Sequence, residues 1–145
     1  MLELLSRAAF DRDVGRLDRR MAAKFGWTVV TSEYPVLDVI FEHAVAAPLR
    51  LRFTCDNWDE LPPRIELLDK AGGYLTQVPP HHGSVFNGSA HDSTGRPFVC
   101  MRGAREYHTH TSHLNDYWAN YRGKPGMDLL GILSQLWRAW KRAVK

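Results

Sequence analysis

The residues best suited to catalysis or metal binding gather between Cys100 and His113. This segment holds one cysteine, the carboxylate of Glu106 and the imidazoles of His108, His110 and His113. On an extended backbone, side chains two positions apart leave the same face of the chain. We therefore expect Glu106, His108 and His110 to lie together on one face.

Two kinds of chemistry fit these residue types. Cys100, Glu106, His108 and His110 offer a mixed donor set for tetrahedral zinc, although their spacing is not that of a standard zinc finger. Alternatively, the Cys100 thiolate attacks a carbonyl while a histidine handles the proton and Glu106 orients that imidazole. A sulfur bound to zinc is a poor acyl carrier, so the two interpretations compete, and we favour the nucleophile. A histidine-rich loop with no chemical role is the plain alternative.

Composition predicts one packed domain over residues 1–145. The chain has 44% hydrophobic and 24% charged residues, which excludes disorder throughout. A net charge of +3 is too small to indicate a nucleic-acid partner. Because the sequence has no apolar stretch of membrane length and no signal-peptide pattern, we expect a cytoplasmic protein without a membrane partner.

Hydrophobic patterns predict an α+β fold in which two helices flank an antiparallel sheet. Apolar residues recur at helical spacing over 10–25, before Gly26, and again over 130–144. A long irregular loop over 70–97 leads to Cys100, and such loops are usually functional. Between the first helix and this loop we expect a meander of four strands, at residues 27–31, 36–41, 49–55 and 64–68.

The strand over 49–55 also predicts the state of the second cysteine. Its residues alternate strictly, so Leu51, Phe53 and Cys55 share the apolar face. We therefore expect Cys55 to be a buried thiol in the core. We expect both cysteines to be free rather than joined in a disulfide.

The order of these features resembles that of the ubiquitin-conjugating enzymes. Pro62-Pro63 precedes the fourth strand, His91 lies nine residues before Cys100, and Gly95 to Val99 resembles the family's approach to its cysteine. Asp92-Ser93 stands where the family has Pro-Asn, so its oxyanion asparagine is missing at that place. The run from Glu106 to His110 resembles a predicted metal-binding family found in bacterial operons for ubiquitin-like conjugation, several of which look like antiviral defence modules.

This resemblance implies a ubiquitin-conjugating-enzyme-like fold and a thioester carrier. Cys100 would accept a ubiquitin-like protein from an activating enzyme and pass it to an amine of a target protein, with no cofactor. His108 or His110 would act as base or oxyanion donor, and Glu106 would orient the imidazole. The alternatives are the zinc site described above and a non-catalytic adaptor that binds a ubiquitin-like protein.

Overall fold

The chain begins with two helices, α1 (Glu3–Val14) and α2 (Arg19–Phe25), in a computed structural model that describes residues 1–145. The prediction of one continuous helix over 10–25 is therefore wrong. α1 ends at Gly15, and Asp18 starts α2 by accepting hydrogen bonds from the N–H groups of Arg20 and Met21. Such a capping residue favours a new helix start over continuation of the old helix. Gly26 closes α2 in the left-handed region, at φ 81°.

The four predicted strands are confirmed as one antiparallel sheet. β1 (Trp27–Glu33), β2 (Val36–Phe41), β3 (Leu49–Thr54) and β4 (Arg64–Leu68) lie side by side in chain order. On one face Leu37, Val39 and Phe41 of β2 pair with Phe53, Leu51 and Leu49 of β3. Cys55 follows β3 and is 0% exposed, so its predicted burial is confirmed.

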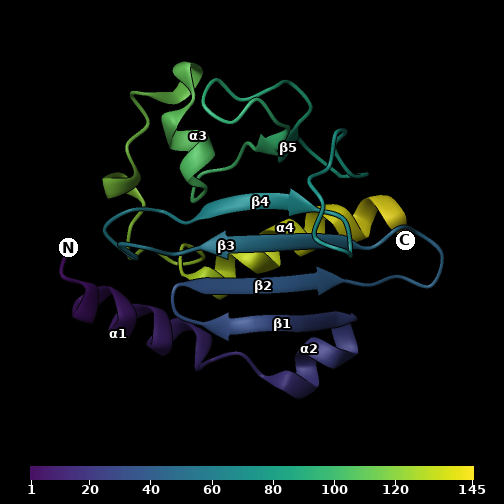
Figure 1. The fold of residues 1–145 in the computed structure, drawn as a ribbon, viewed down its shortest axis with the longest axis horizontal. Helices are drawn as coiled ribbons and strands as arrows, with labels where there is room; N and C mark the ends of the chain where they lie inside the picture. Colours follow the sequence, from purple (N-terminus) through teal and green to yellow (C-terminus); the bar gives the residue numbers. More distant parts are fainter.

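The predicted C-terminal helix is confirmed as α4 (Leu129–Val144), which lies across one face of the sheet (Figure 1). Asp128 starts it by accepting a hydrogen bond from the N–H of Gly131. Leu133, Leu136 and Trp140 of α4 are buried in one core cluster with the apolar face of β2 and β3. None of the helices is both long and apolar enough to cross a membrane.

The segment between β4 and α4 forms a small layer beyond the β4 edge of the sheet (Figure 1). It contains β5 (Phe86–Asn87), β6 (Phe98–Val99), α3 (Arg105–Thr109) and two 3₁₀ turns, η1 (Thr111–His113) and η2 (Trp118–Asn120). β5 pairs with β6, and both β6 and α3 contact β4. Cys100 follows β6 directly, so this layer positions its thiol.

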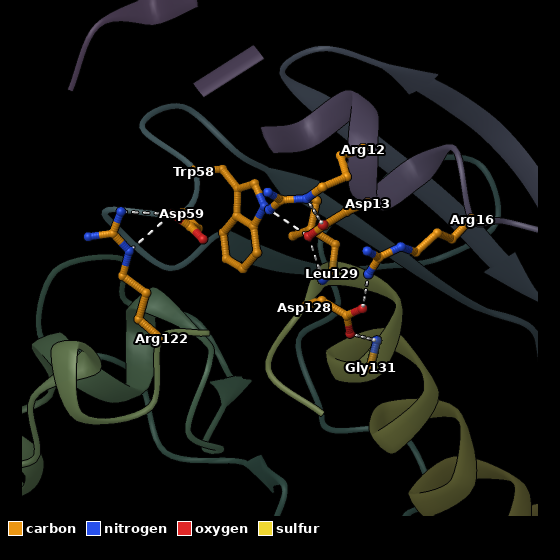
Figure 2. Close-up of polar contacts among 9 residues, drawn as sticks. All are labelled: Arg12, Asp13, Arg16, Trp58, Asp59, Arg122, Asp128, Leu129 and Gly131. Atoms are coloured by element: carbon orange, nitrogen blue, oxygen red, sulfur yellow. Dashed lines mark hydrogen bonds and ion pairs between the residues drawn. The ribbon is translucent and has the colours of Figure 1, made fainter. Parts of the chain in front are cut away.

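A buried carboxylate joins three distant parts of the chain (Figure 2). Asp13, near the end of α1, is 1% exposed. It accepts hydrogen bonds from Trp58 Nε1 at 3.0 Å and from the backbone N–H of Leu129 at 3.2 Å. The Arg12 guanidinium lies 3.4 Å from the same carboxylate. Asp13 thus fixes the start of α4 against α1 and the β3–β4 connection.

Candidate functional site

The Cys100 thiol faces the imidazole of His113. The distance from Cys100 Sγ to His113 Nε2 is 3.7 Å, within the range of a hydrogen bond that involves sulfur. The backbone N–H of Cys100 donates to the carbonyl of Val85 at 2.7 Å, which fixes the start of the loop after β6. Cys100 is half-buried, whereas Cys55 is fully buried, and both thiols are free as expected.

Asn87 is the second polar group at the thiol. It lies in β5, opposite Phe98 of β6, and β6 runs directly into Cys100. Burial raises the pKa of the Cys100 thiol, while the Asn87 side chain partly offsets that rise. Cys100 is therefore a neutral thiol near pH 7, and its attack on a carbonyl needs a base at the sulfur.

His113 is placed to be that base. Its ring stacks on Tyr107, with centroids 4.1 Å apart and an interplanar angle of 16°. The Tyr107 hydroxyl donates to the carboxylate of Asp116, which also accepts hydrogen bonds from Tyr121 and Arg102. These hydrogen bonds hold the Tyr107 ring in place, and the His113 imidazole stacks on that ring.

His110 supports His113 rather than touching the thiol. Its Nδ1 accepts a hydrogen bond from the backbone N–H of Ser112 and so caps η1, the 3₁₀ turn that ends at His113. The His110 ring also stacks on Phe98 of β6, with the ring centroids 5.2 Å apart. These two contacts fix the start of η1 and so help to position His113 beside Cys100.

His108 is held by hydrogen bonds at both ring nitrogens. Nδ1 donates to the carbonyl of Asp116 at 2.7 Å, and Nε2 accepts from the N–H of Gly103 at 3.1 Å. Burial lowers the pKa of His108, so the ring is neutral in this clamp. Gly103 is required there, because its φ is +101° and an added Cβ would lie 3.0 Å from the side chain of Ile132.

Glu106 faces the sheet. It is 8% exposed, and its Oε1 accepts a hydrogen bond from the N–H of Ile65 at 3.0 Å, which ties α3 to β4. Burial raises the pKa of this carboxyl. His91 is buried behind it and donates from Nε2 to the Glu106 carbonyl at 2.8 Å. Both residues therefore hold α3 in place.

The expectation that Glu106, His108 and His110 share one face of an extended segment is wrong, because residues 105–109 form α3. The structure does not bring these three side chains together around Cys100. No group of three or more His, Cys, Asp or Glu side chains is arranged to hold a metal ion. The four ligands of the zinc interpretation thus point to different partners.

Sequence reasoning missed two residues of the site. His113 belongs to the histidine run between Cys100 and His113, but the sequence predicted no role for it. Its contact with the Cys100 thiol depends on how α3 and η1 turn the chain back towards β6. Asn87 precedes a glycine in a loop-like segment and so looks like part of a turn. Only the pairing of β5 with β6 brings its side chain to Cys100.

Cys100 opens onto a surface groove of about 360 Å³. Met101, Arg102, Tyr107, Met127 and Gln135 complete its lining. The groove is thus apolar around the sulfur, with polar side chains at its edges.

A larger cavity, of about 510 Å³, lies around Asp13 and excludes Cys100 (Figure 2). Its acidic side chains are already paired within the chain. Asp59 pairs with Arg122 at 2.9 Å and Asp128 pairs with Arg16 at 3.5 Å. Since this cavity holds no cysteine, serine or threonine and its carboxylates are paired, we place the candidate site at Cys100.

Residues 85–144 match the model of the Y4jH-like family, described as the Y4jH family. The matched region begins just before β5 and runs through α4, so it includes Asn87, Cys100 and His113. The sheet from β1 to β4 lies outside it. No curated protein matches the chain. The similarity to a family thus falls on the part of the chain that builds the candidate site.

Proposed function

We propose that the protein is a conjugating enzyme that carries a ubiquitin-like protein as a thioester on Cys100. It would take the acyl group from an activating enzyme and give it to an amine of a target protein. One observation carries the proposal: the Cys100 residue lines a surface groove, and His113 Nε2 lies 3.7 Å from its thiol. A half-buried thiol with its own base is suited to acyl transfer.

Loading begins with the neutral thiol. Cys100 Sγ attacks the carbonyl carbon of the donor thioester while His113 Nε2 takes the thiol proton. The new S–C bond forms, the bond to the sulfur of the activating enzyme breaks, and His113 returns the proton to that leaving thiolate. The acyl group is then on Cys100 and no oxidant or cofactor is consumed.

Asn87 supplies a hydrogen-bond donor beside the reacting carbon. Asn87 lies in β5, which pairs with β6 just before Cys100, so its side-chain amide would lie near a carbonyl carbon attached to the sulfur. Donors placed where negative charge develops lower the barrier of acyl transfer. The asparagine that the resemblance implies after His91 is absent, and Asn87 offers an amide from β5 instead.

Discharge uses the same groups. The target amine attacks the thioester carbon, the S–C bond breaks, and the amine loses a proton as the amide forms. His113 is the nearest base to that carbon, and the Cys100 thiol is regenerated. The zinc interpretation is less favoured because its four donors already have separate partners.

Loading is tested by mixing the protein with an activating enzyme, its ubiquitin-like protein and ATP, followed by a non-reducing gel. We expect a conjugate band that thiol reductant removes. Cys100→Ser should give no band or a reductant-resistant oxyester, and Cys55→Ser is the matched control that should keep the band. A wild-type protein that never loads from an activating enzyme competent towards other carriers would favour the adaptor, and a reductant-sensitive band from Cys100→Ser would place the nucleophile elsewhere.

A further inference from the structure

The groove at Cys100 continues along α4. A second groove of about 290 Å³ lies next to it, and the two share Met101 and Gln135. Arg138 and Arg142 of α4 line the second groove. We call the two adjoining grooves together the α4 channel, with Cys100 in the lining of one groove and Arg138 and Arg142 in the lining of the other.

The wall opposite α4 is held by backbone hydrogen bonds. The N–H of His82 donates to the carbonyl of Ala139 at 2.9 Å, and the carbonyl of Val85 accepts from the N–H of Cys100 at 2.7 Å. The segment 82–85 therefore follows α4 from Ala139 back to the thiol. Because both ends of this wall are fixed, the α4 channel exists before any ligand enters.

The far end of the α4 channel is positively charged. Arg138 and Arg142 are four residues apart, so they lie on the same side of the helix. Both are exposed, neither makes an ion pair within the chain, and no acidic residue lines either groove. Two unpaired guanidinium groups favour a ligand with carboxylates.

The near end suits a polypeptide backbone. Gln135 donates from Nε2 to the carbonyls of Gly126 and Gly131, which fixes its side chain and leaves Oε1 without a partner in the chain. Met101 and Met127 supply flexible apolar surface beside it. The seven helical steps from Gln135 to Arg142 span about 10 Å, the length of roughly three extended residues.

We propose that the α4 channel binds the extended C-terminal segment of the carried protein and selects segments with acidic residues. The acidic side chains would lie about three to five residues before the residue acylated onto Cys100, where they meet Arg138 and Arg142. The inference rests on the proposed function, because it is the thioester that holds one end of the segment at Cys100.

Short synthetic peptides made as thioesters of a small thiol test this without an activating enzyme. One peptide carries Asp and Glu at those positions and its matched control carries Asn and Gln. Acylation of Cys100 is followed by intact-protein mass spectrometry. We expect the acidic peptide to react roughly three- to ten-fold faster at low salt, and the difference to shrink at high salt.

The double variant Arg138→Glu/Arg142→Glu should lose or reverse this preference. Lys141→Glu changes the same charge on the same helix outside the α4 channel and should keep it. Equal acylation rates for both peptides with the wild-type protein would overturn the proposed binding in the α4 channel, and so would the same loss of preference in Lys141→Glu. Neither result would contradict the proposed thioester on Cys100. If neither peptide acylates Cys100 while free cysteine is acylated, the proposed function itself fails.

Discussion

Substitutions of Glu106 test whether this residue stabilises the fold around the site or takes part in the chemistry at Cys100. Its carboxylate is buried at α3 and accepts the Ile65 N–H at 3.0 Å. Glu106→Ala removes that acceptor and leaves a buried N–H without a partner. Such a loss costs about 1–3 kcal/mol of the free energy of unfolding, and Glu106→Gln should avoid most of it because the amide oxygen still accepts the bond.

The pH dependence of this effect follows from burial. Because burial raises the pKa of Glu106, the folded state binds its proton more tightly than the unfolded state does. The stabilisation by wild-type Glu106 is therefore fully present below its unfolded pKa of about 4.3, and is lost as pH rises through the folded pKa. We expect the stability of Glu106→Gln relative to wild type to improve as the pH is raised from about 4.5 to about 8.

Urea unfolding followed by tryptophan fluorescence measures both variants, with Glu3→Ala, at an exposed position of α1, as the control. A Glu106→Ala protein as stable as wild type would refute the assigned contact. A Glu106→Gln protein that folds normally but no longer acylates Cys100 would show that Glu106 acts in the chemistry instead.

Three further results are expected. Asp13→Ala leaves the buried donors of Trp58 and Leu129 unpaired and should cost about 2–5 kcal/mol of unfolding free energy, whereas exposed Asp11→Ala should cost little; equal costs would contradict the assigned network. Asn87→Ala removes a side chain that lowers the pKa of Cys100, so the pH profile of iodoacetamide alkylation should shift to higher pH; a shift to lower pH would contradict that effect of Asn87. Native thiol titration should modify Cys100 alone, because burial raises the pKa of Cys55 and closes it to reagent; a faster reaction at Cys55 would place it outside the core.

The sheet could be predicted from the sequence because its signals are local. The alternation over 49–55 reflects one buried and one open face, and the structure has that face pattern in β3. The prediction of a single first helix failed because the spacing of apolar residues does not show where one helix ends and the next begins. Gly15 and Asp18 divide residues 10–25 into two helices while the apolar periodicity continues across them.

The candidate site could be located but not assembled from the sequence. Cys100 and the histidine run mark the right segment, yet which imidazole reaches the sulfur depends on α3 and η1 turning the chain. The five-residue helix α3 sends Glu106 towards β4 and His108 towards Gly103, so His113 becomes the neighbour of Cys100. Asn87 lies in β5, which pairs with β6. Each of these strands has only two residues, which is too short for a periodic sequence pattern to predict it.

The most direct test of the account is the single-turnover rate of Cys100 acylation in two histidine variants. His113→Gln removes the base beside the sulfur, and we expect a loss of roughly 100-fold or more near neutral pH. His110→Asn keeps a side-chain cap for η1 and is the matched control, with a rate within a few-fold of wild type. If His113→Gln is acylated at the wild-type rate, His113 is not the base for Cys100. If His110→Asn is slowed as much as His113→Gln, the loss in both variants comes from the placement of η1, and the assignment of His113 as the base loses its support.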